Sequence, residues 1–250
     1  MLRIRGLTVG FGDTPVLEGI DLDLEQGQFV SLVGPSGSGK TSILRVITNL
    51  LAPRGGTVEL DAPVRDVGFL FQDDALLPWR TVRQNVMLGL HIRRVARDEA
   101  ETRADHWLER LGLAGFGDRY PGQLSGGQRK RVAIAQVLTL QPRLLLMDEP
   151  FASLDAIVRA RITQELLDWV EREHLTVLLV THDLEEAISV SDVVYVLGHG
   201  PRAAIRARHA IDIPRPRRLL DTRQHPSFGS LLARLWTDLS GELPAEGPTS

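Results

Sequence analysis

Residues 34–41 have the types and spacing of a loop that binds phosphate groups. They read Gly34-Pro35-Ser36-Gly37-Ser38-Gly39-Lys40-Thr41, which satisfies the pattern G-x-x-x-x-G-K-[ST]. The glycines let backbone N–H groups converge on phosphates, and the N-terminus of a following helix adds a partial positive charge. Lys40 and Lys130 are the only lysines in a chain that otherwise uses arginine, and a compact ammonium fits between phosphates where a guanidinium is too broad. We therefore predict a nucleotide site, with Lys40 at the β- and γ-phosphates.

A second group of chemically active side chains lies at residues 144–149. Here an apolar run ends in two adjacent carboxylates, Asp148 and Glu149. Side chains alternate along a strand, so the two carboxylates leave it in different directions and are expected to have different roles. An ordinary solvated strand end can carry the same pair. The phosphate-binding loop upstream favours a functional pair.

A third motif, Leu124-Ser125-Gly126-Gly127-Gln128, precedes a predicted helix over 129–139. Ser125 is placed to cap that helix, and the glycine N–H groups point outward from its positive end. A plain helix cap explains the serine but not two successive glycines, which weaken a helix start by about 1 kcal/mol each. Their presence is explained if the backbone approaches a γ-phosphate.

Together these motifs resemble those of the ATP-binding cassette (ABC) family, over roughly residues 1–210. In that family the serine and glycines of one subunit reach the nucleotide held by the phosphate loop of another. The resemblance therefore implies a dimer of this chain that encloses ATP and Mg²⁺ and hydrolyses the ATP. It also implies an α/β fold of the P-loop NTPase type, with a RecA-like core, an N-terminal antiparallel β layer and an inserted α-helical lobe.

The resemblance assigns roles to individual residues. Glu149 matches the base that polarises the attacking water, and His182 matches the residue that contacts the γ-phosphate and holds that glutamate. Gln72 matches a glutamine that contacts the metal and the lytic water. The metal contacts that it implies are Thr41, Gln72 and Asp148. The residues that it implies for nucleotide binding are Phe11, Val16, Gly34, Pro35, Ser36, Gly37, Ser38, Gly39, Lys40, Thr41, Ser42, Ser125, Gly126, Gly127, Gln128 and Asp155.

Two further segments match the family by position. Phe11 occupies the place where the family stacks an aromatic ring on adenine, with Val16 beside the sugar and base. Many members have a tyrosine there; phenylalanine keeps stacking worth about 0.5–1.5 kcal/mol, and we expect little discrimination among purines from it. Ser153-Leu154-Asp155 matches the family's D-loop, which crosses the dimer interface.

The elements that position these residues follow an α/β pattern. Continuous apolar runs indicate parallel strands covered on both faces. The predicted strands are 29–33, 144–148, 175–180 and 193–197, with helices over 157–173 and 183–190.

Other parts of the chain differ from this pattern. Residues 76–141 carry helical signals, including a predicted capping box of Asp98 and Glu101, and we expect them to form the inserted lobe. Residues 2–25 suit short antiparallel strands. We therefore predict one ABC ATPase domain over 1–210. Residues 211–250 are rich in proline and arginine, and we expect a tail with a short helix over 228–239.

Composition narrows the class of protein. The chain has 250 residues, a net charge of −3 and no cysteine, which disfavours nonspecific nucleic-acid binding and excludes disulfide frameworks and thiolate metal sites. No apolar run reaches the roughly 18 residues that span a bilayer, and the N-terminus lacks a secretory signal. We expect a cytosolic protein that lies peripherally on the cytoplasmic face of the cell membrane.

Two segments resemble the nitrate, aliphatic sulfonate and taurine importer branch: Phe71-Gln72-Asp73-Asp74-Ala75-Leu76-Leu77-Pro78-Trp79 and Pro214-Arg215-Pro216-Arg217-Arg218. The resemblance implies integral membrane permease subunits as partners, an extracytoplasmic solute-binding protein acting through them, and no nucleic acid. The solute is left open, because specificity would lie in those subunits.

Two other classes of ABC ATPase are weighed against the importer. A soluble scaffold for iron–sulfur cluster assembly would keep the same motifs, but the apolar Leu76–Trp79 segment favours a membrane partner. A DNA-repair type ATPase is disfavoured because about 85 residues, rather than a long coiled coil, separate the phosphate loop from the pentapeptide.

The sequence leaves the packing of two places open, Leu76–Trp79 and Gln136. Leu76–Trp79 either packs inside the helical lobe or lines a groove for a short helix of a membrane subunit, with Trp79 as an anchor. Gln136 stands where many members have an arginine, so local packing of its helix is expected to differ.

Overall fold

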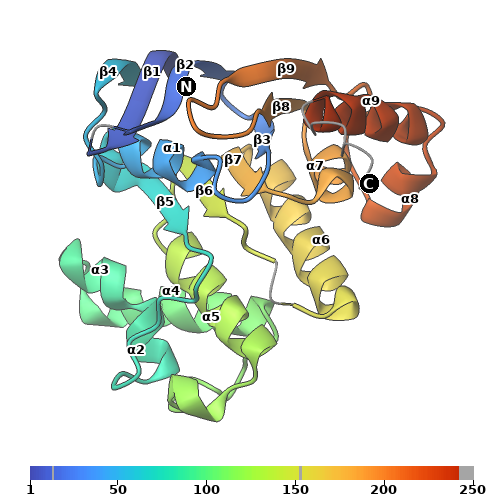
Figure 1. The fold of residues 1–250 in the computed structure, drawn as a ribbon. Helices are drawn as coiled ribbons and strands as arrows, with labels where there is room; N and C mark the ends of the chain where they lie inside the picture. The colour runs from blue at the N-terminus through green and yellow to red at the C-terminus, as the bar shows by residue number, and fades with distance from the viewer. Residues whose placement is uncertain (13, 152–153, 242–250) are drawn as a thin grey trace, which may run out of the picture. The chain divides into compact units, whose positions relative to one another are not determined.

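The computed structural model describes residues 1–12, 14–151 and 154–241. The chain divides into two compact units, coloured along the sequence in Figure 1. One unit comprises residues 1–61 and the chain from residue 170 onward, and the other comprises residues 62–169. The first carries the phosphate-binding loop, and the second carries the pentapeptide at 124–128.

An antiparallel sheet is built from the N-terminal residues of the first unit. Strands β1 (Leu2–Phe11), β2 (Thr14–Leu24) and β4 (Gly55–Leu60) pair in the order β2-β1-β4 (Figure 1). Burial alternates at the start of β1, where Leu2 and Ile4 are buried and Arg3 is exposed, as in a sheet with one face toward the core. This confirms the predicted antiparallel β layer.

The first unit has four further strands: β3 (Phe29–Val33), β7 (Thr176–Thr181), β8 (Val193–Leu197) and β9 (Ile205–Ala210). β3 runs parallel to both β7 and β8, and β9 is antiparallel to β8. Every residue of β3, β7 and β8 is buried, as expected for strands covered on both faces. Helices α1 (Lys40–Ile47) and α7 (Leu184–Val190) follow β3 and β7 along the chain.

Residues 211–241 pack onto the first unit and contain a helix where the sequence predicts one. They form α8 (Leu219–Gln224) and α9 (Phe228–Ser240). α9 buries Phe228, Leu231 and Leu235 in one hydrophobic cluster with residues of α7 and β8. These residues therefore belong to the core of this unit, because the apolar side of α9 covers it.

The arginines of this segment are anchored at Asp192. Its carboxylate accepts hydrogen bonds from Arg215 at 2.5 Å and from the buried Arg217 at 2.8 Å. The same carboxylate accepts the backbone N–H of Phe29 at 2.8 Å. The proline- and arginine-rich segment thus ties the chain after β9 to the first residue of β3.

The second unit combines two parallel strands with a group of helices. β5 (Val67–Leu70) pairs in parallel with β6 (Leu144–Asp148). The helices are α2 (Val82–Val86), α3 (Leu88–Ile92), α4 (Arg97–Arg110) and α5 (Gly126–Leu138), with short 3-10 turns at Val64–Asp66 and Pro121–Gln123 (Figure 1). α6 (Ala156–Glu173) lies mostly in this unit, where Trp169 packs edge-on against Trp107 of α4 at 5.5 Å between ring centroids.

The predicted capping box of Asp98 and Glu101 is wrong. α4 begins at Arg97 with Ala96 as its N-cap, so Asp98 lies inside the first turn. An acidic residue there still favours the helix, because the N-terminus carries a partial positive charge. Glu101 instead forms an ion pair with Arg97 at 2.8 Å.

Candidate active site

The phosphate-binding loop joins β3 to α1 and is shaped by its glycines. Gly39 has a φ of 97°, and a Cβ atom there would lie 2.9 Å from side-chain atoms of Val16 and Leu17. At Gly34, a Cβ atom would lie 2.9 Å from the carbonyl oxygen of Leu197. Side chains at these two positions would displace the neighbouring strands, so glycine keeps the backbone bare, as close approach of a phosphate requires.

Two polar side chains of this loop, those of Ser38 and Lys40, are buried. Lys40 is 5% exposed, and its ammonium donates hydrogen bonds of 2.8 Å to the carbonyl oxygens of both Gly34 and Pro35. Among the described residues, the buried hydroxyl of Ser38 has no hydrogen-bond partner. Leaving such a group unpaired costs about 1–3 kcal/mol. A ligand with phosphate oxygens would remove that cost, so the loop fits a nucleotide.

Thr41 and Ser42 lie in the first turn of α1. The N–H groups of Ser42 and Ile43 both donate to the carbonyl oxygen of Gly39, at 2.9 and 3.3 Å, so the helix begins directly at the loop. The positive end of the helix dipole therefore lies at the loop. Ser36 and Gly37 form its exposed outer part.

Two residues, Val16 and Phe11, are predicted to contact the base. Val16 lies against the loop, as its contact with the Cβ position of Gly39 shows. Phe11 ends β1, and 53% of its surface is exposed. An exposed ring at this place is available for stacking on a flat base.

His182 follows β7 at the same edge of the sheet as the phosphate-binding loop, because Val33 pairs with Thr181. The histidine is exposed. The Thr181 hydroxyl donates to the Glu186 carboxylate at 2.6 Å and accepts the N–H of Asp183 at 3.1 Å. Asp183 in turn caps α7 by accepting the N–H of Glu186 at 3.0 Å. These contacts hold the turn that carries His182. The sequence analysis did not identify Glu186, although the spacing Asp183-x-x-Glu186 is that of a helix cap and could have indicated it.

Asp148 is the last residue of the buried strand β6, and Glu149 follows it directly. Asp148 is 5% exposed, and Glu149 is half-buried with a φ of 43°. This left-handed conformation is unusual for a residue with a side chain, and it turns the chain sharply after Asp148. Because Leu70 pairs with Met147, the loop that carries Gln72 leaves the sheet beside the two carboxylates.

Gln72 lies in a loop that is held by the second lysine of the chain. Lys130 donates to the carbonyl oxygen of Gln72 at 2.9 Å and to that of Phe71 at 3.2 Å, and it lies 3.5 Å from the Asp74 carboxylate. Burial lowers the pKa of Lys130 below its ordinary value, and Asp74 opposes that shift. Sequence reasoning noticed this lysine but gave it no role.

The pentapeptide begins α5 as predicted, with the helix starting earlier than expected. Ser125 is the N-cap: its hydroxyl accepts the N–H of Gln128 at 3.3 Å, and the Gln128 side chain accepts the N–H of Ser125 at 2.9 Å. Gly126 and Gly127 therefore lie inside the first turn. A Cβ atom on Gly127 would lie 3.2 Å from Val158 of α6, so packing within the unit also favours glycine there.

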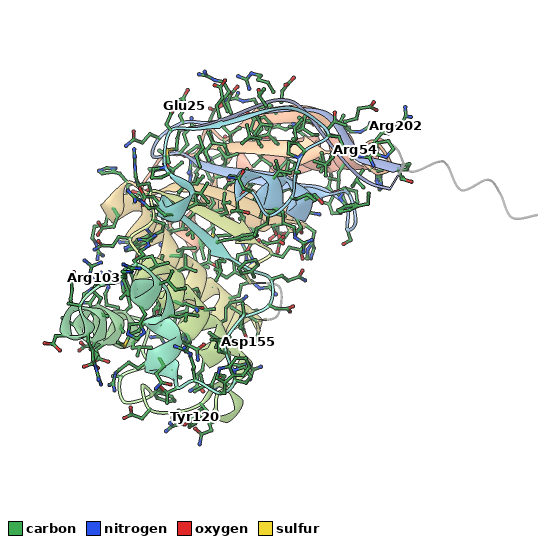
Figure 2. All side chains as sticks on the ribbon, turned by 90° about the vertical axis from the view of Figure 1, so that its left-hand side faces the viewer. Glu25, Arg54, Arg103, Tyr120, Asp155 and Arg202 are labelled. Atoms are coloured by element: carbon green, nitrogen blue, oxygen red, sulfur yellow. The ribbon has the colours of Figure 1, made fainter. Side chains whose placement is uncertain are left out.

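Asp155 caps the helix that follows the carboxylates. Its carboxylate accepts the N–H of Val158 at 2.9 Å, and the residue is exposed. Figure 2 labels Asp155 together with Tyr120, which belongs to the same unit. Ser153, also part of the predicted D-loop, lies outside the described residues.

In the Leu76–Trp79 segment, the tryptophan is not buried in the hydrophobic core. Trp79 is 72% exposed, whereas Leu76 and Leu77 are half-buried. The backbone of Leu77 is held by Asn85, which accepts its N–H at 2.7 Å. Trp79 is therefore available for contact with another protein.

A small, mostly apolar cavity lies within the second unit, near the start of the Gln72 loop. Its volume is about 240 Å³. Its lining includes Phe69, Phe71, Asp74, Ile92, Gln136 and Leu140. Gln136, the departure from the family pattern, thus borders this cavity.

The predicted site residues divide between the two units. The first carries the phosphate-binding loop, Phe11, Val16 and His182, and the second carries the Gln72 loop, the carboxylate pair, Ser125–Gln128 and Asp155. Among the described residues, no group of three or more histidines and carboxylates is arranged to hold a metal ion. The same part of the chain contains no helix that is both long and apolar enough to cross a membrane. The roles assigned to these residues stay predictions.

Comparison with known proteins places the chain in a family. A family model described as ABC transporter matches residues 17–152, more than half of the chain. The chain belongs to the ABC transporter family. This ABC protein is similar to the ATP-binding cassette MJ0796 in the dimeric structure of its post-hydrolysis state, bound to ADP and Pi. The TM-score is 0.76 and the sequence identity is 30%. The match covers 86% of this chain and 100% of the other. This likeness confirms the predicted ABC ATPase fold.

Curated relatives of this ABC protein are ATP-binding subunits of transporters. The aliphatic sulfonates import ATP-binding protein SsuB 2 of Rhodococcus jostii is 42% identical, over 96% of this chain and 95% of the relative. SsuB 2 of Streptomyces avermitilis is 45% identical, over 95% and 90%. The bicarbonate transport ATP-binding protein CmpC of Synechococcus elongatus is 41% identical over 88% of this chain but only 34% of the relative, so the chain spans about a third of CmpC.

Proposed function

We propose that this chain is the ATP-hydrolysing subunit of an ABC importer for a small solute. The observation that carries the proposal is its likeness, over nearly the full length of both chains, to import ATP-binding proteins. The bare glycine loop supports nucleotide binding, because it has no room for side chains at Gly34 and Gly39. The partly exposed Phe11 supports stacking on the base.

Hydrolysis in this proposal uses Glu149 as a general base. The carboxylate takes a proton from water as the water oxygen attacks the γ-phosphorus; the bond to the β-phosphate oxygen breaks, and ADP and phosphate are released. Lys40 stabilises negative charge on the β- and γ-phosphates. His182 contacts the γ-phosphate, and the contacts of Thr181, Asp183 and Glu186 keep its turn in place.

The donor set suits Mg²⁺. Thr41, Gln72 and Asp148 offer hydroxyl, amide and carboxylate oxygens, which are hard ligands of the kind that Mg²⁺ prefers. We assign these three residues to the metal, with Asp148 held in place by its burial at the end of β6. Mg²⁺ held by these residues would supply positive charge that offsets the negative charge of the phosphate groups.

A dimer of this chain is part of the proposal. The first N–H groups of a helix lack partners within the helix, and in α5 those groups belong to Gly126 and Gly127. We propose that they and Ser125 meet the γ-phosphate held by the second copy, with Asp155 near the contact. The structure of MJ0796 with ADP and Pi is described as dimeric, which supports the formation of a dimer.

The relatives' names support the proposed class of solute, and the importer function suggests the other partners. Relatives are named for aliphatic sulfonates, bicarbonate and sulfate or thiosulfate, so we propose a small anion or sulfonate, including nitrate and taurine. Integral membrane permease subunits would hold this chain on the cytoplasmic face of the membrane, and a solute-binding protein would act through them. The cavity beside the Gln72 loop and the exposed Trp79 support such a contact.

The proposal is tested by reconstituting the chain with candidate permease subunits. ATP hydrolysis is measured in lipid nanodiscs with the solute-binding protein and each candidate anion, with and without EDTA. We expect EDTA to abolish hydrolysis and one anion to stimulate it. The proposal would be overturned if the rate of ATP hydrolysis did not respond to the permease and its solute, or if no Mg²⁺-dependent hydrolysis were found.

A further inference from the structure

We infer that Lys130 is a positioning residue that holds the Gln72 loop, residues 71–74, from the helix that carries Ser125. The inference rests on the proposed function, because that function gives Gln72 its contact with the metal and the attacking water. It adds a mechanical link within the second unit. The link joins two motifs that lie 53 residues apart, from Gln72 to Ser125.

The contacts of Lys130 are directed to a single short loop. The side chain is 0% exposed, and its ammonium donates to the carbonyl oxygens of Phe71 and Gln72. Its third interaction is the ion pair with Asp74 at 3.5 Å. An ammonium has three N–H donors, so all of them have a partner in this loop. Both carbonyls lie directly after the end of β5 at Leu70.

Lysine suits this place better than the arginine that the chain otherwise uses. A point-like ammonium converges on two successive carbonyls, whereas a planar guanidinium spreads its donors. Lys40 makes the same arrangement with the carbonyls of Gly34 and Pro35. Both lysines of the chain therefore hold successive carbonyls in a loop that follows a strand.

Burial adds a second argument for a specific role. A buried charge is costly unless it is paired and hydrogen-bonded, and an apolar side chain of the same length would avoid that cost. Asp74 is shared with Arg129, whose guanidinium lies 3.4 Å from it. The carboxylate therefore already has one cation without Lys130, whereas the lysine adds the bonds to the loop carbonyls.

The helix makes the link rigid. α5 is continuous from Gly126 to Leu138 and is capped by Ser125, so Ser125 and the ammonium of Lys130 belong to one element. A movement of Ser125 on binding or release of nucleotide would carry the Gln72 loop with it. Loss of the ammonium would leave Gln72 in a range of positions.

The first test removes the ammonium. Lys130→Met keeps an unbranched side chain but removes the charge and donors. We expect kcat for ATP hydrolysis to fall by about 10-fold to 100-fold, because small misplacements of a reacting group cost up to about 10² in rate. The Kd of a fluorescent ATP analogue should not change, because the phosphate-binding loop is untouched. Lys130→Arg should restore part of kcat.

A double-mutant cycle shows whether Lys130 acts through Gln72. Gln72→Ala alone should lower kcat, and adding Lys130→Met to it should cause little further loss. Full additivity of the two losses would overturn the inference. If Gln72→Ala hydrolyses ATP like the wild type, the proposed role of Gln72 fails instead, and the exchange experiment decides on Lys130 alone.

Hydrogen exchange measures the hold on the loop without any need for activity. Amide exchange in the peptide over 71–80 should be faster in Lys130→Met than in the wild type. Arg131→Met is the matched control, because Arg131 also donates from α5 to a carbonyl oxygen, that of Leu111 at 3.3 Å, outside the loop. We expect it to leave exchange over 71–80 unchanged.

Equal exchange over 71–80 in the wild type and Lys130→Met would overturn the inference. If Lys130→Met does not fold, Lys130→Gln takes its place in the same measurement, because its side chain is uncharged and shorter than lysine. Asp74→Asn then provides a second variant, which should show a smaller acceleration over 71–80. No acceleration in either variant would also overturn the inference.

Discussion

At the scale of single residues, Glu149 combines a strained backbone with a half-buried carboxylate. Its φ of 43° costs about 1–2 kcal/mol for a residue with a side chain. A glycine would avoid the strain, so the glutamate brings its carboxylate to this place at a cost in local stability. Strain of this kind collects at functional sites, and this supports the choice of Glu149 over Asp148 as the base.

Glu149→Gln tests that choice. The amide keeps the shape and the hydrogen-bonding capacity of the side chain but cannot accept the proton. We expect turnover to fall by roughly 10² to 10⁴, with ATP binding retained and an ATP-bound dimer accumulating. Steady-state hydrolysis and size-exclusion chromatography measure the two effects. Near wild-type turnover would remove Glu149 from the role of base.

Ser125→Arg tests whether the pentapeptide acts on the second copy. The arginine places a bulky charge where the other subunit's γ-phosphate is expected, but it leaves the phosphate-binding loop of its own unit unchanged. We expect ATP binding to survive while dimerisation and turnover fail. Analytical ultracentrifugation with and without ATP measures the dimer.

The matched control is Ser125→Ala, because the arginine also removes the helix cap. Alanine loses the hydrogen bond to Gln128, at a cost of about 1 kcal/mol, without adding bulk. It should dimerise more readily than Ser125→Arg. Equal loss of ATP affinity and dimerisation in the arginine variant would contradict this division of roles.

At the scale of elements, strands and loops next to a motif could be predicted, and packing between distant elements could not. The apolar run 29–33 and the glycines after it predict β3 and its loop from local chemistry alone. The apolar piece over 228–239 predicts the helix that the structure shows as α9. Its packing against α7 and β8 was not predicted, because that contact joins residues that are far apart in the sequence.

The start of a helix was equally hard to place. Gly126 and Gly127 are poor helix formers, so we predicted a later start, yet the capping box of Ser125 and Gln128 begins α5 before them. For α4, the sequence predicts Asp98 as the cap, two residues after the observed N-cap Ala96. Caps depend on backbone conformation, which side-chain types indicate only in part.

Leu235→Ala tests the packing of α9. Leu235 is 0% exposed in the cluster with α7 and β8, so the truncation should lower the free energy of unfolding by about 2–5 kcal/mol. Urea unfolding measures it. Leu220→Ala, at a leucine of α8 that is 74% exposed, is the matched control and should change stability little. Similar losses in both variants would contradict the packing of α9.

At the scale of the whole molecule, the proposed chemistry draws on both units. The short motifs of each unit could be found from sequence, because each lies within a few consecutive residues. Lys130 was given no role because its partner Phe71 lies 59 residues away, a separation that no local pattern reveals. Contacts with partner proteins are harder still to predict from this sequence, because they also depend on the surfaces of those proteins.

Trp79 provides the test of coupling to a membrane partner. It is 72% exposed, and truncation of a tryptophan anchor in an interface costs about 2 kcal/mol or more. Trp79→Ala should therefore leave the melting temperature and basal ATP hydrolysis of the isolated protein unchanged. It should weaken assembly with the permease by roughly 30-fold, the equivalent of about 2 kcal/mol, and stop solute-stimulated hydrolysis.

The control for that experiment is Trp236→Ala, because Trp236 is also exposed, at 55%, but lies on α9 in the other unit. Its removal should affect neither assembly nor stimulated hydrolysis. Thermal melting and pull-down with detergent-solubilised permease separate folding from coupling in both variants. A Trp79→Ala protein that melts several degrees lower yet assembles and transports normally would show that Trp79 serves stability, because loss of an interface anchor acts on the complex and not on the isolated fold.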